Sequence, residues 1–164
     1  RATLNTIEPK QTGQIVVKFD PATPVYGPIE AAMYILVNGT KDENNKIRIT
    51  ADIHEDFSQL TDEQKKLAPI ADISNIQLGT LTIGKKVKKA VNLTNAGSNT
   101  LYVRRMMVSN IKATAPKSVA GGKKGQIKLE ITPNQKGDFN QVMTIITNDP
   151  VKPVQKVNIS WKVD

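Results

Sequence analysis

One short segment of the chain, His54-Glu55-Asp56, places an imidazole beside carboxylates. His54 is the only histidine among the 164 residues, and there is no cysteine. A catalytic triad needs a nucleophile and an orienting group that the fold brings to the imidazole, and sequence neighbours do not supply them. The lack of cysteine excludes disulfides, thiolate catalysis and the common structural zinc sites. We therefore predict a protein that is not an enzyme and has no catalytic, metal-binding or cofactor-binding residue.

Two polar loops carry weaker signals. Asp42–Asn45 offers oxygen ligands but lacks the loop glycine and the distal glutamate of an EF-hand, so we interpret it as a polar hairpin tip. Gly121–Gly125 is rich in glycine, yet no Gly-Lys-Ser/Thr follows, as a phosphate-binding loop requires. We expect it to be a flexible turn between two strands.

Positive charge is concentrated in the second part of the chain. The net charge is +8, and residues 71–164 carry 15 Lys and Arg against 5 Asp and Glu. Such a surplus is typical of a surface that binds an anionic glycan, a membrane or nucleic acid, and also of a soluble domain that displays lysines. No apolar run approaches the ~20 residues of a membrane-spanning helix.

The densest basic cluster is the run from Lys85 to Lys89. On a strand, Lys86 and Lys88 point to one face and Lys85 and Lys89 to the other, so the run is not one patch. Lysines on an edge strand also prevent pairing with other chains. Tyr102 is the one aromatic residue near the basic residues, so we do not expect binding of nucleic acid by base stacking. The candidate anion-binding residues are Lys85, Lys86, Lys88, Lys89, Arg104, Arg105, Lys123 and Lys124.

An internal repeat organises the elements that carry these residues. Gly13-Gln14-Ile15 recurs 112 residues later as Gly125-Gln126-Ile127, and further on the spacing becomes 110. The pairs at that spacing are Gly27/Gly137, Met33/Met143, Ile35/Ile145, Asn38/Asn148, Lys46/Lys156, Ile49/Ile159 and Ile53/Val163. A constant spacing over several strand-like runs indicates that the chain begins with the C-terminal half of a unit whose complete copy follows.

Both copies have the period-two alternation of β-strands, separated by turn residues. In the second copy we predict strands at Ile73–Leu78, Val87–Asn95, Leu101–Ser109, Gln126–Thr132, Phe139–Thr147 and Val157–Val163, with a weak one at Ile111–Thr114. In the first copy we predict Gln14–Asp20, Ile29–Asn38 and Lys46–Ile53. About seven short strands favour an all-β, immunoglobulin-like sandwich. Its predicted core is Val91, Leu93, Leu101, Val103, Leu129, Ile131, Phe139, Ile145, Ile159 and Trp161.

A short helical linker joins the two copies. Thr61 and Gln64 have the spacing of a capping box, and Pro69 discourages continuation of the helix. We expect Phe57, Leu60 and Leu67 to dock against the sandwiches. The predicted organisation is a partial repeat over residues 1–53, a linker over 54–70 and a complete domain over 71–164.

The second copy resembles the bacterial domain-of-unknown-function repeats related to Hydin-type (ASH) and major-sperm-protein-like immunoglobulin folds. The residues that carry this resemblance are Ile76–Gly79, Val91–Gly97, Leu101–Val103, Gly122–Gly125, Gly137–Phe139 and Thr147–Pro150. Many members have a cysteine-containing segment after the third strand, whereas Ser109–Pro116 here has none. The resemblance implies an exported bacterial envelope protein, in the periplasm or at the cell surface, without an assigned activity.

Two functional hypotheses follow. The first is a non-catalytic structural or protein-interaction module in a tandem chain of sandwiches. The second is an anion- or glycan-binding module that uses the lysines of the second domain. In the partial first copy, Ile15, Val17, Phe19, Met33, Ile35, Ile47 and Ile49 would lack an opposing sheet. Since a three-stranded sheet needs one face covered, we expect a protein partner or self-association through that face.

Overall fold

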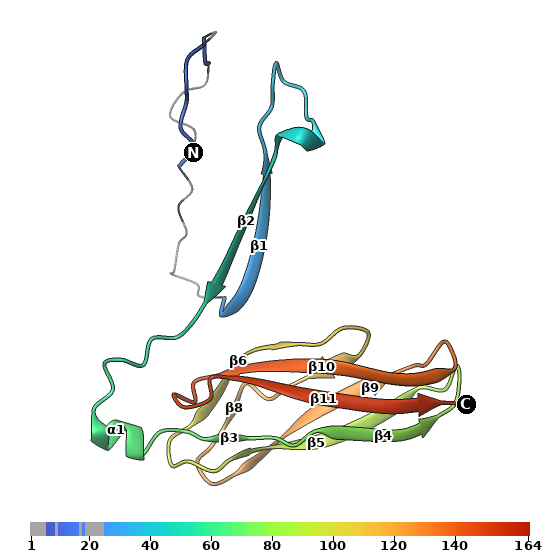
Figure 1. The fold of residues 1–164 in the computed structure, drawn as a ribbon. Coiled ribbons are helices and arrows are strands. Elements are labelled where there is room, and N and C mark those ends of the chain that lie inside the picture. The colour runs from blue at the N-terminus through green and yellow to red at the C-terminus, as the bar shows by residue number, and fades with distance from the viewer. Residues whose placement is uncertain (1–5, 9, 17, 19–24) are drawn as a thin grey trace.

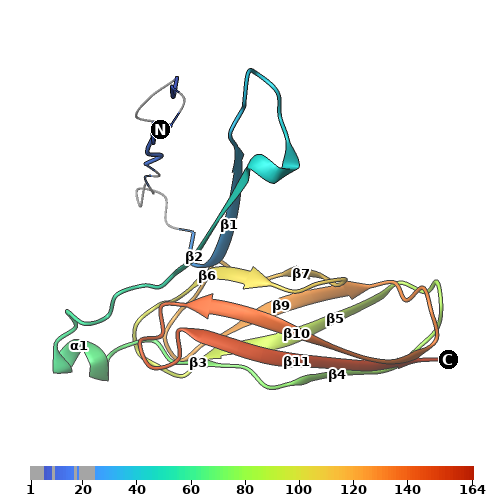
Figure 2. The same cartoon turned by 45° about the horizontal axis from the view of Figure 1, so that its top comes forward.

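The computed structural model describes residues 6–8, 10–16, 18 and 25–164, and shows a β-sandwich within residues 71–164 (Figures 1 and 2). One sheet has the order β4-β11-β10-β6-β8 and the other the order β3-β5-β9-β7. The first contains β4 (Ile76–Leu81), β6 (Leu101–Met107), β8 (Ser118–Val119), β10 (Gly137–Thr147) and β11 (Val154–Val163). The second contains β3 (Ala71–Asp72), β5 (Val87–Asn95), β7 (Lys112–Thr114) and β9 (Lys124–Ile131). The predicted immunoglobulin-like sandwich is confirmed.

Alternating apolar residues build the core between the two sheets. On β9, Ile127, Leu129 and Ile131 are buried while Lys128 between them is exposed. Most of the predicted core residues are buried, namely Leu93, Leu101, Leu129, Ile131, Ile145, Ile159 and Trp161. The other three, Val91, Val103 and Phe139, are partly buried and pack against them. Burial of one such aliphatic side chain contributes about 1.5–3 kcal/mol, so the core holds without disulfides.

The first predicted strand of the complete copy is wrong at its start. Ala71 and Asp72 form β3 and pair with β5, whereas β4 begins only at Ile76 and pairs in parallel with β11 in the other sheet. The chain therefore changes sheets between Asp72 and Ile76. Strands of two residues, such as β3 and β8, are too short to show an alternation, so the sequence pattern could not predict them.

The strands β1 (Gly27–Tyr34) and β2 (Lys46–Ile53) form an antiparallel hairpin that projects from the sandwich (Figure 1). Its register pairs Gly27 with Ile53, and the register of β10 and β11 pairs Gly137 with Val163. Each of the eight pairs of the first hairpin lies 110 residues before a pair of the second. The repeat seen in the sequence is therefore also a repeat of backbone pairing.

The predicted strands of the first copy are confirmed in part. β2 has the predicted bounds, while β1 ends at Tyr34 rather than at Asn38. Of the predicted strand Gln14–Asp20, residues 17, 19 and 20 lie outside the described residues, and residues 14–16 and 18 show a single bridge residue, Ile15, and no strand.

The linker contains the helix α1 (Asp62–Lys66), and its capping box is confirmed. The backbone N–H of Gln64 donates to Thr61 Oγ1 at 3.3 Å, and the N–H of Thr61 donates to Gln64 Oε1 at 2.9 Å. The prediction that Leu67 docks is wrong, because its side chain lies where the helix ends and is 51% exposed. The next residue, Ala68, is buried. No helix of the described residues is long and apolar enough to cross a membrane.

Candidate functional site

The three residues of the segment around His54 have separate partners. His54 Nε2 lies 3.2 Å from Asp52 Oδ2, and both side chains are exposed. Asp56 accepts a hydrogen bond of 2.9 Å from the backbone N–H of Ser58, which lowers the pKa of the Asp56 carboxyl. Glu55 binds an arginine of the sandwich. Within the described residues no group of three or more His, Asp and Glu side chains could hold a metal ion.

The two polar loops have structural roles. Asp42 caps the 3-10 helix η1 (Glu43–Asn45) at the hairpin tip by accepting the N–H of Asn44 at 2.8 Å. Gly121 and Gly122 form the turn before β9, where Gly122 has a φ of +65°. A side chain at Gly121 would collide with the backbone oxygen of Ser98. Glycine at this turn is therefore required by close packing.

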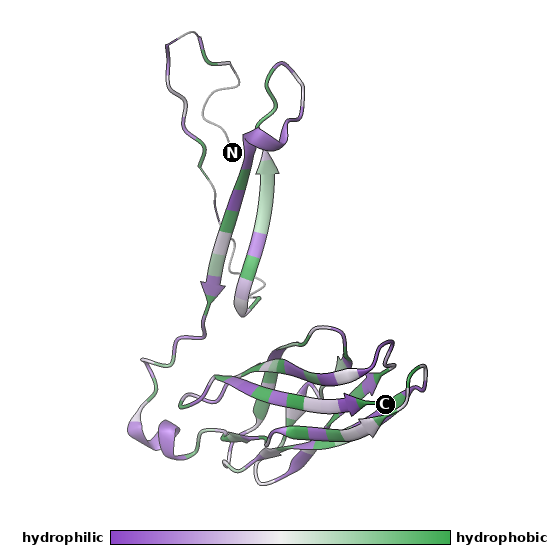
Figure 3. Ribbon diagram, turned by 45° about the vertical axis from the view of Figure 1, so that its right-hand side comes forward, coloured by the Kyte–Doolittle hydropathy of each residue, from purple (hydrophilic) through white to green (hydrophobic). Residues whose placement is uncertain are grey.

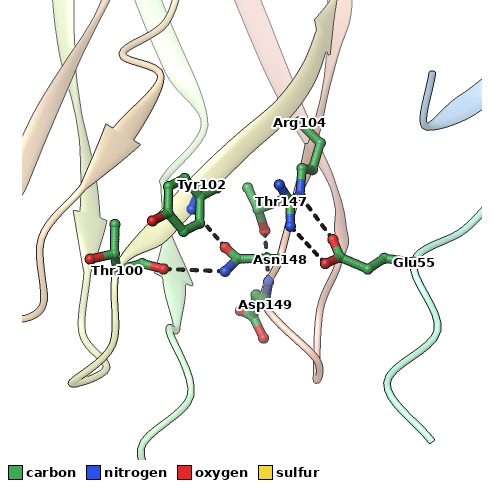
Figure 4. A network of polar contacts seen from close by, with 7 residues as sticks. All are labelled: Glu55, Thr100, Tyr102, Arg104, Thr147, Asn148 and Asp149. Atoms are coloured by element: carbon green, nitrogen blue, oxygen red, sulfur yellow. Dashed lines mark hydrogen bonds and ion pairs between the residues drawn. The ribbon is translucent and has the colours of Figure 1, made fainter. Parts of the chain in front are cut away.

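Arg104 on β6 clasps the linker to the sandwich (Figure 4). Its Nε and Nη2 donate to the two carboxylate oxygens of Glu55 at 2.9 and 2.7 Å. The guanidinium also lies over the rings of Tyr26 and Tyr102, 5.4 and 5.5 Å from their centroids. The hydrogen bonds to Glu55 raise the pKa of Arg104. A bidentate pair of this kind fixes orientation as well as distance.

Strand β6, which carries Arg104, is held in place by hydrogen bonds from the turn after β10. Asn148, at the turn after β10, accepts the N–H of Tyr102 at 2.6 Å and donates to the carbonyl of Thr100 at 3.2 Å (Figure 4). Next to it, the buried Asp149 accepts the N–H of Ala71 at 2.9 Å. The motif Thr147–Pro150 therefore positions β6 and the first strand of the sandwich.

Arg105 fastens the base of the hairpin. Its Nη1 donates to the backbone oxygens of Tyr26 at 3.2 Å and Pro28 at 2.8 Å. Gly27, between them, is buried, and a side chain there would collide with Ile146 of β10. Arg104 and Arg105 therefore serve the contact between hairpin and sandwich. The charge of Arg104 is matched by the Glu55 carboxylate, whereas Arg105 donates to neutral backbone oxygens.

The lysines gather on the outer face of the sheet β3-β5-β9-β7. The register places Lys88 opposite Glu130, Ala90 opposite Lys128 and Asn92 opposite Gln126. On the neighbouring strand β7, Lys112 lies opposite Glu130 and Thr114 opposite Lys128. We call this surface the lysine face. It comprises Asp72, Lys86, Lys88, Ala90, Asn92, Thr94, Lys112, Thr114, Lys124, Gln126, Lys128 and Glu130.

Sequence reasoning identified only part of the lysine face. Lys86, Lys88 and Lys124 belong to it, whereas Lys89 shares the register position of the buried Leu129 and lies on the other side of β5. Lys85 and Lys123 lie in turns. Lys112 and Lys128 were missed, although each alternates with inward-facing residues and this alternation could have placed them.

A depression of about 380 Å³ lies in the lysine face. Its lining includes Lys88, Ala90, Lys112, Thr114 and Lys128. The face carries two carboxylates among the described residues. Glu130 pairs with Lys86 Nζ at 3.0 Å and Lys88 Nζ at 3.8 Å, and Asp72 on β3 lies opposite Thr94. The hydrogen bond from Lys86 lowers the pKa of Glu130. The five lysines thus outnumber the two carboxylates, and the surface is cationic.

The hairpin presents an apolar face that the sandwich does not cover. Ile29 and Ala51, Ala31 and Ile49, and Met33 and Ile47 are cross-strand pairs on that face, while charged and polar side chains occupy the other. Figure 3 shows the resulting alternation of hydrophobic and hydrophilic bands along β2. None of these six side chains is fully buried. In the sandwich the equivalent face is packed against a second sheet.

Comparisons with known proteins identify a family and a fold. The family profile described as "Protein of unknown function (DUF1573)" matches residues 70–163. A crystal structure of a protein of unknown function from Porphyromonas gingivalis W83 is similar at a TM-score of 0.65 and 16% identity, covering 86% of this chain and 67% of that one. The ASH / PapD-like domain 7 of human CEP192 aligns at a TM-score of 0.46 and 12% identity, covering 68% of this chain and 98% of that one. No relative was found among the curated proteins.

Proposed function

The chain belongs to the DUF1573 family, proteins of unknown function, and we propose that it is a non-catalytic structural link in a tandem array of immunoglobulin-like domains. In this proposal the hairpin β1–β2 completes one sandwich, and the clasp formed by Arg104, Arg105 and Glu55 holds the next sandwich at a fixed angle to it. The observation that carries the proposal is the shared register of the two hairpins at a spacing of 110 residues.

The contacts between hairpin and sandwich support a joint of defined geometry. A flexible linker would leave Tyr26 and Glu55 in solvent, whereas here both contact Arg104 and the backbone of Pro28 contacts Arg105. A bidentate ion pair fixes orientation as well as distance, and the close approach of Gly27 to Ile146 leaves no room for a side chain, so these contacts favour one relative orientation. In this proposal the strands that complete the sandwich of the hairpin and cover its apolar face come from another protein segment, either a partner or a second copy of this chain.

Distances between two spin labels test the joint. The chain has no cysteine, so Thr50→Cys on the hairpin and Lys156→Cys on β11 give unique labelling sites. We expect a narrow distribution of distances in the otherwise unchanged chain and a broad one after Arg104→Gln with Arg105→Gln. Lys136→Gln with Lys152→Gln is the control for the loss of two positive charges and should leave the distribution narrow. A broad distribution before any arginine is replaced would contradict the proposal.

A further inference from the structure

We propose that the lysine face binds an extended acidic polysaccharide, a sugar polymer that carries carboxylate or sulfate groups. This inference is independent of the proposed tandem link. It rests on the solvent-facing side of the sheet β3-β5-β9-β7 and uses none of the clasp residues. The ligand class follows from three features of the face: its charge, its polar uncharged side chains, and the depression that Ala90 helps to line.

The charge of the face favours a polymer with repeated acidic groups. Lys86, Lys88, Lys112, Lys124 and Lys128 extend over three adjacent strands, and neighbouring strands in a sheet lie about 4.8 Å apart. The cations are therefore spread along a surface and do not converge on one point. A single small anion would contact only one or two of them, whereas an extended polyanion contacts several at once.

Polar uncharged side chains between the lysines suit sugar hydroxyls. Asn92 and Gln126 lie directly opposite each other, and Thr114 lies opposite Lys128. Amides and hydroxyls both donate and accept hydrogen bonds, as sugar hydroxyls do. The depression that the small side chain of Ala90 helps to line gives a chain of sugar rings room to lie between the lysine side chains.

The same face is a poor match for nucleic acid or for a protein partner. Single-stranded nucleic acid is bound by stacking on aromatic rings, and the lysine face contains none. Protein interfaces depend on a few aromatic or large apolar anchors, and here the largest uncharged outward side chains are amides. An acidic polysaccharide needs neither kind of anchor.

Titration with polygalacturonate and with heparin, at low and moderate salt, tests the site. We expect both to bind and neutral dextran not to bind. The triple variant Lys88→Gln, Lys112→Gln, Lys128→Gln should weaken binding roughly tenfold and reduce its salt dependence. The control Lys66→Gln, Lys152→Gln, Lys156→Gln removes the same charge from elsewhere and should change affinity by at most about twofold. If both triple variants weakened binding equally, the proposed site would be wrong, because the total charge of the protein alone would then explain the affinity.

Two further variants sharpen the assignment. Glu130→Gln removes the competing carboxylate from Lys86 and Lys88, so it should strengthen binding of heparin several-fold. Asn92→Ala with Gln126→Ala should weaken binding of polygalacturonate and leave that of poly-L-glutamate unchanged, while Asn140→Ala on the other sheet affects neither. If poly-L-glutamate binds as tightly as polygalacturonate and the amide variants alter neither, the polysaccharide class is wrong.

Discussion

The two hairpins of this chain have the same backbone pairing and opposite environments. Met143 in β10 is fully buried, whereas its counterpart Met33 in β1 is only half-buried. The counterpart of the buried Trp161 is the exposed Ala51. Register is set locally by the alternation and by the connecting loop, and burial is set by whatever lies across the apolar face. A sequence repeat can therefore preserve the register of two strands without preserving the burial of their side chains.

The turns of the two hairpins show the same contrast. After β10, Asp149 is buried and its carboxylate accepts N–H groups of Ala71, Val151 and Lys152. The residue 110 positions earlier is Gly39, which has open space around it and a φ of +77°. One turn ties its hairpin to another strand, and the other turn is free to extend into solvent. The first hairpin is thus held mainly at its base, by the clasp.

The largest expected effect of this contrast is on association. A second copy of the chain that covers the apolar face would make the protein a dimer in dilute solution. Met33→Lys with Ile49→Lys places charges on that face and should give a monomer, since burial of unpaired ammonium groups is strongly unfavourable. Light scattering after size-exclusion chromatography measures the mass directly.

The control for association uses the polar face of the same strands. Ala32→Lys with Thr50→Lys adds the same charge on the side that already carries Arg48 and Glu30, and should leave the dimer intact. A chain that is monomeric before any substitution would refute self-association through this face and favour a different protein partner.

Truncation of the paired methionines gives the next largest effect. Met143→Ala opens a cavity in the core and should lower the free energy of unfolding of the sandwich by about 2–5 kcal/mol. Met33→Ala should change that free energy by less than about 0.5 kcal/mol, because its side chain is not packed in the sandwich. Urea unfolding followed by the fluorescence of Trp161 reports on the sandwich alone. Equal losses would mean that the hairpin shares the core.

Sequence reasoning succeeded where a pattern extends over several consecutive residues. It failed for side-chain contacts between residues that are far apart in the sequence. The alternation in Ile127, Leu129 and Ile131 predicted both the strand and its buried side, and the offset of 110 predicted the hairpin. Sequence analysis singled out both Glu55 and Arg104 but could not pair them, because 49 residues separate them and no spacing rule links them. The lysine face was found in part, since it assembles from four strands whose order the sequence does not state.

The paired glycines Gly27 and Gly137 offer a smaller and more local test. Both have a positive φ, of +85° and +133°, which an alanine adopts only with strain. Gly137→Ala should destabilise the sandwich by about 1–2 kcal/mol. Gly27→Ala should leave the stability of the sandwich unchanged within about 0.5 kcal/mol. It should instead broaden the distance between hairpin and sandwich, because its methyl group collides with Ile146. Destabilisation of the sandwich by Gly27→Ala would show that the two parts unfold together.

The smallest expected effect is a pH dependence of the stability of the tip of the first hairpin. The hydroxyl of Tyr34 donates to Glu43 Oε1 at 2.8 Å, and Lys46 Nζ lies 3.6 Å from the same carboxylate. The hydrogen bond from Tyr34 lowers the pKa of Glu43. A lowered pKa means that the ionised carboxylate stabilises the folded hairpin tip above the unfolded pKa, and that this stabilisation is lost as the pH falls through the folded value.

Because no second sheet within the described residues covers this hairpin, its tip depends more on such surface contacts than the tip of the second hairpin does. The residues 110 positions after Tyr34 and Lys46 are Thr144 and Lys156, and the structure gives them no comparable carboxylate partner among the described residues. Amide chemical shifts of β1 and β2 should therefore move between pH 7 and pH 3, while those of β10 and β11 near Thr144 stay constant. Glu43→Gln should abolish the shift change at the first tip. Parallel changes in both hairpins, or a change that persists in Glu43→Gln, would show that the tip of the first hairpin does not rely on this carboxylate.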